Sequence, residues 1–171
     1  DRDGSVPGSV TAEDLAFSED LVLQHDLDYC TKIADLCREK EVQLIWFTIP
    51  TSSEELLSIT GYQESIDYMN AFCEKTGAPY LNFNLIRERD QLFPDTSFSN
   101  HIHLSKAGAD LFTPILCDTI RKLESGDAVD DLFYENAEQM LQDIHRIAGS
   151  RLTVEAQPDG SLLFTACSLQ N

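Results

Sequence analysis

Apolar residues recur along this chain in two patterns, one with helical spacing and one in short continuous runs. Four segments repeat apolar positions every three or four residues and are predicted to be helices: residues 26–40, 62–76, 106–124 and 128–148. Residues 42–49 and 79–83 are apolar runs of strand length, and the first is nearly continuous. A continuous run is typical of a strand that is covered on both faces in a parallel sheet.

Local signals mark where several of these elements begin. Asp26 and Ser105 are predicted to cap the first and third helices. Ser52 and Glu55 form a capping box for a short helical turn between the first strand and the second helix. Pro114 lies inside the third helix, where we expect a kink or a broken first segment.

The apolar face of each helix is expected to point into the core. The inward positions are Leu27, Cys30, Ile33, Ala34 and Cys37 in the first helix, Tyr62, Ile66, Met69 and Cys73 in the second, Ala109, Phe112, Leu116, Ile120 and Leu123 in the third, and Val129, Phe133, Met140, Ile144 and Ala148 in the last. Cys117 also falls on an apolar stripe. Because no two of the five cysteines form a C-x-x-C pair, we interpret the four helical ones as small core residues.

The order helix, strand, helix, strand, helix favours parallel strands joined by right-handed crossovers. We therefore expect an α/β fold in three layers, in which a short parallel sheet is flanked by helices as in flavodoxin-like folds. A C-terminal helix and a β-hairpin follow, with strands at residues 152–157 and 161–168 around a Pro158-Asp159-Gly160 turn. Two strands do not make a stable sheet, so further strands are expected from the hairpin or from an N-terminal half that this chain lacks.

This pattern divides the chain into three parts. Residues 1–20, rich in Gly, Ser and Pro at their start, are expected to be a flexible segment. Residues 21–126 form the α/β core, in which 84–105 is a polar loop. Residues 127–171 form an appendage of an acidic helix and the hairpin.

Charge and hydropathy narrow the range of partners. The 171 residues carry a net charge of −18, which opposes binding to nucleic acid or to anionic lipid surfaces. The longest apolar run has four residues, at 44–47, whereas a membrane helix needs about 20, so no membrane insertion is expected within this chain. The acidic helix at 128–148 is a candidate surface for a protein partner.

Residues 98–112 hold the strongest candidate for chemistry. His103 lies in the polar loop after the second strand and before the third helix, where open α/β sheets place their active sites. Asn100 lies three residues before it. The alternative is a histidine that holds the loop by hydrogen bonds and has no catalytic role.

The block Asn-His-Ile-His-Leu-Ser-Lys-Ala-Gly-Ala at residues 100–109 resembles the last conserved block of the SGNH (GDSL-like) hydrolases. The resemblance is closest to the bacterial branch with cell-envelope acyltransferases and DltD-like proteins, which carry Asp-x-x-His-Leu-Asn-x-x-Gly there. It covers residues 26–124, with 42–50 and 79–84 matching the last two core strands of that family.

The resemblance implies ester hydrolysis or acyl transfer on an acylated cell-envelope glycan or lipid-linked substrate, without a cofactor. It makes His103 the general base and Asn100 the residue that orients it, and it implies a soluble domain in the cell envelope or outside the cell. The family aspartate is replaced by Asn100, and no apolar strand followed by Gly-Asp-Ser is present, so the nucleophilic serine is expected from outside this chain.

Weaker alternatives remain at the same loop. Ser52 and Ser53 follow the first strand and are alternative nucleophiles, although helix capping already explains them. His101 and His103 alternate like metal ligands, with Asp95 as the nearest third ligand, but we favour the hydrolase interpretation and expect no metal. The second functional hypothesis is a non-catalytic binding or scaffolding domain of the cell envelope that has kept the fold and lost the triad.

Overall fold

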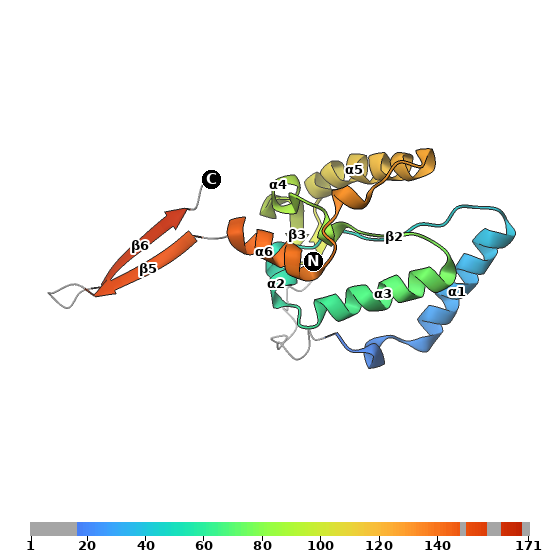
Figure 1. The fold of residues 1–171 in the computed structure, drawn as a ribbon, viewed down its shortest axis with the longest axis horizontal. Helices are drawn as coiled ribbons and strands as arrows, with labels where there is room; N and C mark the ends of the chain where they lie inside the picture. The colour runs from blue at the N-terminus through green and yellow to red at the C-terminus, as the bar shows by residue number, and fades with distance from the viewer. Residues whose placement is uncertain (1–16, 148–149, 157–161, 169–171) are drawn as a thin grey trace, which may run out of the picture.

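Helices and short paired strands make up the chain in a computed structural model, which describes residues 17–147, 150–156 and 162–168 (Figure 1). The helices are α1 (Gln24–Glu39), α2 (Ser53–Ser58), α3 (Tyr62–Thr76), α4 (Arg89–Leu92), α5 (Lys106–Ser125) and α6 (Ala137–Ile147). The strands are β1 (Trp46–Thr48), β2 (Tyr80–Asn82), β3 (Phe98–Asn100), β4 (His103–Leu104), β5 (Ser150–Ala156) and β6 (Leu162–Ser168). The described residues also contain four 3₁₀ turns: η1 (Glu19–Leu21), which precedes α1, and η2 (Phe83–Leu85), η3 (Asp95–Ser97) and η4 (Asp130–Leu132), which lie between later elements.

The described strands pair in twos. β1 and β2 are parallel, with Trp46 opposite Tyr80, and α2 and α3 lie between them in the sequence. β3 pairs with β4, and β5 pairs with β6, both antiparallel. The parallel pair and the hairpin confirm the predicted α/β class, but the hairpin adds no strand to the β1–β2 sheet.

The first strand is shorter than its sequence predicts. Of the eight residues at 42–49, only Trp46–Thr48 are strand. The expectation that both faces are covered is also wrong, because Phe47 is 44% exposed and Ile49 is 39% exposed. Among the described strands, β1 pairs with β2 alone, and the ladder has three residue pairs.

The predicted second helix and two predicted caps are confirmed. α3 spans the predicted residues and ends at Gly77, whose φ of 72° is the left-handed conformation that closes many helices. The Ser52 hydroxyl accepts a hydrogen bond from the Glu55 N–H at 3.2 Å, and the Ser105 hydroxyl accepts one from the Gly108 N–H at 3.1 Å. The other half of the predicted capping box does not form, because the Ser52 N–H donates to the His101 carbonyl.

Details of the first and third helices differ from expectation. α1 begins at Gln24, so Asp26 lies in its first turn and is not its cap. α5 runs unbroken through Pro114. Ile33 is 47% exposed, and Ala109 and Cys117 are exposed too, because α1 and α5 are covered along narrower stripes than their apolar pattern suggests.

The last helix is shorter than predicted. α6 begins at residue 137, because the Asn136 side chain accepts a hydrogen bond from the Gln139 N–H at 2.9 Å and caps the helix there. Residues 128–136 instead contain η4 and an isolated antiparallel bridge between Ile86 and Phe133. The predicted acidic helix therefore covers only part of residues 128–148.

The predicted polar loop at 84–105 is in fact largely structured. It contains α4, η3, β3 and β4, and it buries Leu85, Ile86 and Phe93 in the core. Each of these elements has four residues or fewer, which is too short to show a periodic pattern. This segment joins the sheet to α5 and positions the candidate site.

Two hydrophobic clusters form the core. The first packs α2, α3 and α6 together and comprises Leu56, Ile66, Leu85, Tyr134, Ala137, Met140 and Ile144. The second lies between β2 and α5 and comprises Leu81, Phe83, Ile86, Phe93, Phe112 and Val129. Phe83 is completely buried and meets Phe112 edge to face at 4.9 Å between ring centroids. The sheet is thus anchored to α5 by aromatic packing.

Some predictions fall outside the described residues. The expected flexible segment at 1–20 lies there except for its last four residues, which enter η1, and the turn at 158–160 lies there too. Of the described helices, none combines the length and the apolar character required to cross a membrane.

The start of α5 approaches the main chain closely. A Cβ atom added at Gly108 would lie 2.0 Å from the Ser97 carbonyl oxygen and 2.9 Å from its carbon. Ser97 also accepts a backbone hydrogen bond from Ser105 at 2.8 Å. Because a carbonyl in the main chain cannot turn aside as a flexible side chain can, only glycine fits here.

We expect Gly108→Ala to destabilise the protein by at least about 2 kcal/mol, since the added methyl overlaps the Ser97 carbonyl. At an ordinary helix position, the same Gly→Ala change would stabilise the protein by about 1 kcal/mol. Gly126→Ala is the matched control, since its Cβ meets open space and only its φ of 78° is strained. Urea unfolding measures both, and a Gly108→Ala protein as stable as the wild type would contradict the contact.

A second prediction concerns Tyr80 in β2. Burial raises the pKa of Tyr80 to about 12, although its hydrogen bond to Thr48 across the sheet, 2.6 Å long, acts in the opposite direction. The unfolded phenol ionises near about pH 10. The folded state therefore keeps its proton longer, and this contribution to stability is complete below pH 10 and is lost as the pH rises to 12.

We expect wild-type stability to fall by about 3 kcal/mol more than that of Tyr80→Phe across this interval. Tyr29→Phe, which removes an exposed phenol, should follow the wild type. Unfolding by urea at a series of pH values between 8 and 12 gives the comparison. If the free energies of unfolding of the wild type and Tyr80→Phe fall equally with pH, the buried phenol is not the cause of the fall.

Candidate functional site

The candidate histidine lies in a tight hairpin. β3 and β4 pair Phe98 with Leu104 and Asn100 with His103, with an irregularity between the two pairs. His101 and Ile102 form the turn. Both Asn100 and His103 are exposed, so the imidazole is open to a ligand.

The side-chain oxygen of Asn100 accepts three hydrogen bonds. Two come from the backbone N–H groups of Ile102, at 3.1 Å, and His103, at 2.9 Å. The third is to Nδ1 of the His103 ring, at 2.9 Å. A backbone N–H can only donate, so the two backbone contacts identify the Asn100 atom as oxygen, and Nδ1 must carry the proton.

This assignment fixes the tautomer of the neutral ring. With the proton on Nδ1, the lone pair lies on Nε2, which no described interaction occupies. The family resemblance implies that Asn100 orients His103, and the structure brings the two side chains into contact. The pair can accept a proton from a bound hydroxyl or water.

The hairpin lies at the carboxyl end of the parallel strands. The His101 carbonyl accepts a hydrogen bond from the Ser52 N–H at 2.8 Å, and Ser52 follows β1. His101 Nδ1 also lies 3.4 Å from a carboxylate oxygen of Glu54 in α2. The histidine loop and the segment after β1 are therefore neighbours.

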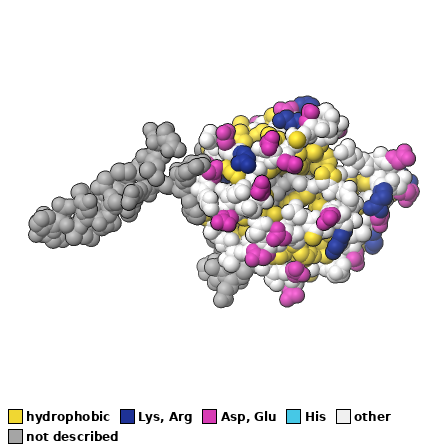
Figure 2. All heavy atoms as spheres, viewed as in Figure 1, with side chains coloured by type: hydrophobic (Ala, Val, Ile, Leu, Met, Phe, Trp, Pro, Cys, Tyr) yellow, Lys and Arg dark blue, Asp and Glu magenta, His cyan; other side chains and the backbone are white. Residues whose placement is uncertain are grey.

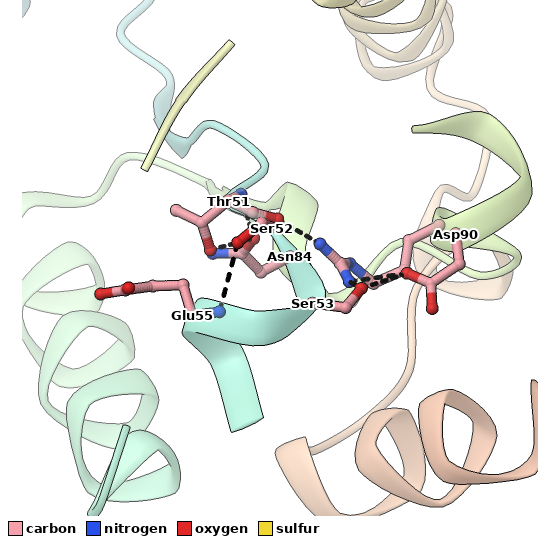
Figure 3. A network of polar contacts seen from close by, with 7 residues as sticks. Thr51, Ser52, Ser53, Glu55, Asn84 and Asp90 are labelled. Atoms are coloured by element: carbon pink, nitrogen blue, oxygen red, sulfur yellow. Dashed lines mark hydrogen bonds and ion pairs between the residues drawn. The ribbon is translucent and has the colours of Figure 1, made fainter. Parts of the chain in front are cut away.

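The two candidate serines are engaged in the fold (Figure 3). Ser52 is buried and its hydroxyl caps α2. The Ser53 hydroxyl donates to Asp90 Oδ1 at 2.6 Å and accepts from Arg89 Nη1 at 2.5 Å. Within the described residues, no hydrogen bond joins either hydroxyl to His103, so the structure does not bring these candidates together.

Arg89 organises the network around Ser53. Its side chain is 3% exposed and also donates to the Thr51 carbonyl and to Asp90 Oδ1, the latter at 2.8 Å. Burial lowers the pKa of the Arg89 guanidinium, and the adjacent Asp90 carboxylate counteracts part of that shift. Arg89 Nε has no hydrogen-bond partner in the described residues. The guanidinium thus ties α4 to the segment after β1.

A second polar link joins the ends of the two parallel strands. The Asn84 side-chain oxygen accepts hydrogen bonds from the Thr51 N–H at 2.8 Å and from the Thr51 hydroxyl at 3.3 Å. Figure 3 shows Asn84 between Thr51 and α2. Sequence analysis missed Asn84, Arg89 and Asp90, and the only signal was their place just after the second strand.

A cavity of about 750 Å³ lies beside this network. Its wall includes Ser53, Asp90, Phe93, Asn100 and His101, so it adjoins the hairpin. Glu54 and Asp95 also line it and make the wall acidic. His103 is not among its lining residues, so the cavity reaches the pair through Asn100.

The weaker metal hypothesis gains no support from the geometry. In the part of the chain that the structure describes, no three His, Cys, Asp or Glu residues are grouped to hold a metal ion. His101 Nδ1 lies beside the Glu54 carboxylate, and His101 does not form a set of metal ligands with His103 and Asp95.

Comparison with protein-family models, with curated proteins and with solved structures found no match to this chain. The case for a function therefore rests on the geometry of the site and on the motif in the sequence.

Replacing Arg89 tests whether the network supports the fold. We expect Arg89→Met to lower the free energy of unfolding by about 3 kcal/mol or more, because it leaves Asp90 and Ser53 without their buried partner. Arg121→Met is the control, since Arg121 forms an exposed ion pair with Asp118 and should cost less than about 1 kcal/mol. Equal effects in urea unfolding would contradict the structural role of Arg89.

Proposed function

We propose that this chain is part of an SGNH-like ester hydrolase or acyltransferase that acts on acylated cell-envelope glycans or lipid-linked substrates. The observation that carries the proposal is the Asn100–His103 hydrogen bond, which leaves Nε2 as the basic nitrogen. The motif at residues 100–109 and the position of the hairpin after β1 support it. On this proposal the site lies in the cell envelope or outside the cell.

The proposal implies a larger sheet than the described strands form. In a three-layer SGNH-like domain, β1 and β2 are the end of a longer parallel sheet flanked by helices on both faces. The exposed Phe47 on β1 supports this, because an apolar strand is ordinarily covered. The strand that completes the sheet would also bring the nucleophilic serine.

In the proposed reaction, His103 Nε2 takes the proton from the serine hydroxyl as its oxygen attacks the acyl carbonyl. The resulting imidazolium gives that proton to the departing alcohol, which leaves an acyl-serine ester. Water or an acceptor hydroxyl then repeats the sequence, with Nε2 first taking and then returning the proton. The entry of water gives hydrolysis, and the entry of an acceptor hydroxyl gives acyl transfer.

Asn100 can perform only one of the two roles of a triad aspartate: it fixes the histidine tautomer but supplies no negative charge. In serine proteases, replacing the triad aspartate by asparagine costs about four orders of magnitude in turnover, largely because the histidine adopts the wrong tautomer. Here the backbone N–H groups of Ile102 and His103 hold the Asn100 oxygen toward the ring, so the tautomer is correct. What is missing is the negative charge that stabilises the imidazolium.

The alternative is a non-catalytic binding or scaffolding domain of the envelope, with the acidic segment around α6 as a surface for a protein partner. The engagement of both Ser52 and Ser53 in structural hydrogen bonds favours it. On this alternative, His103 only closes the hairpin.

Hydrolysis of p-nitrophenyl acetate distinguishes the two. This activated ester needs no serine, because an accessible Nε2 attacks it directly or activates water. We expect His103→Ala to lower the rate at least tenfold and Asn100→Asp to raise it about tenfold or more, since the carboxylate stabilises the imidazolium.

His25→Ala is the control, because His25 lies in the first turn of α1 and its Nε2 is engaged 3.0 Å from the Asp26 carboxylate. Its rate should equal that of the wild type. A wild-type rate no higher than that of His103→Ala would favour the non-catalytic alternative.

A further inference from the structure

The outer face of α1 carries an uncovered apolar stripe. Tyr29, Ile33 and Leu36 are 62%, 47% and 53% exposed. Their spacing of four and then three residues places them on one side of the helix. The helix meets α3 through a different side, on which Ala34 is buried. In the part of the chain that the structure describes, no other element covers the stripe, although the Lys32 ammonium of α1 itself lies 4.8 Å from the centroid of the Tyr29 ring.

Opposite charges stand at the two ends of this stripe. Asp26 lies three residues before Tyr29, and Lys40 lies four residues after Leu36. Together the five positions follow the alternating three- and four-residue spacing of a helix-pairing seam. The side chains of Asp26 and Lys40 are 62% and 61% exposed. Their present partners, His25 and Glu39, are exposed sequence neighbours and hold them weakly.

We propose that α1 pairs with α1 of a second copy of this chain, antiparallel and across a two-fold axis at Ile33. In that arrangement Ile33 meets its own mate, and Tyr29 lies against Leu36 of the other copy. Asp26 of each copy then faces Lys40 of the other, so both ends of the seam are closed by opposite charges. A parallel pair would instead place like charges together at each end.

The buried area sets the strength of this contact. Side chains of this size have roughly 150–250 Å² each, so the three exposed apolar ones offer roughly 300 Å² per copy. For both copies this is roughly 600 Å², below the roughly 1,200 Å² at which specific, stable interfaces begin and within the range of weak, transient contacts. The net charge of −18 on each copy opposes association. The dimer is therefore weak and reversible at physiological salt.

Figure 2 shows acidic side chains scattered over the visible face of the molecule, with Lys and Arg side chains and apolar atoms exposed between them.

Sedimentation velocity at physiological salt, over protein concentrations from about 10 to 500 µM, tests the proposal. The expected result is a mass that rises from 19.2 kDa toward twice that value. Ile33→Lys should weaken the dimer at least tenfold, because it places two ammonium groups together at the axis. Leu111→Lys is the matched control, since Leu111 is 46% exposed on another helix, and it should dimerise like the wild type.

Charge reversal tests the antiparallel geometry. Asp26→Lys and Lys40→Asp should each weaken the dimer several-fold, whereas the double variant should recover wild-type affinity. Circular dichroism checks that α1 stays folded in each variant. A wild-type monomer at every concentration would overturn the proposal, as would a dimer unaffected by Ile33→Lys. A dimer that is lost on Phe47→Lys but not on Ile33→Lys would assign the contact to the open edge of β1 and equally overturn it.

Discussion

The buried guanidinium of Arg89 holds together the edge of the sheet where the candidate site lies. A parallel ladder of three residue pairs supplies few hydrogen bonds, so the segments that follow the strands need other attachments. Arg89 binds the Thr51 carbonyl, the Ser53 hydroxyl and the Asp90 carboxylate from a position almost without solvent. A charge in such a place is tolerated only with its partners. The Ser53 hydroxyl therefore serves the fold.

The long elements of the fold could be predicted from the sequence, whereas the short ones could not. α3 was predicted correctly because its apolar spacing and Gly77 both mark the same helix. The strand at 42–49 was overestimated, since an apolar run shows a preference for burial but cannot supply a neighbouring strand. The sequence of residues 84–105 indicates a loop, since the packing that orders this segment depends on contacts with α5 and η4. Tertiary contacts decided both cases.

The candidate site was predictable to the extent that it is local. Asn100 and His103 are three residues apart, and a hairpin brings such residues into contact without help from the rest of the chain. Arg89 and Asp90 meet Ser53 across 36 and 37 residues, and no spacing in the sequence indicates that meeting. The capping role of Ser52 was foreseen because its partner lies three residues away.

The contact between Gly108 and Ser97 has a mechanical consequence. Main-chain atoms touch there with no side chain between them, and Ser105 is hydrogen-bonded to both residues. These contacts hold Ser97, just before the histidine hairpin, and Ser105, just after it, against the first turn of α5. A helix of 20 residues is about 30 Å long, so a small tilt of that first turn gives a larger displacement at the far end of α5.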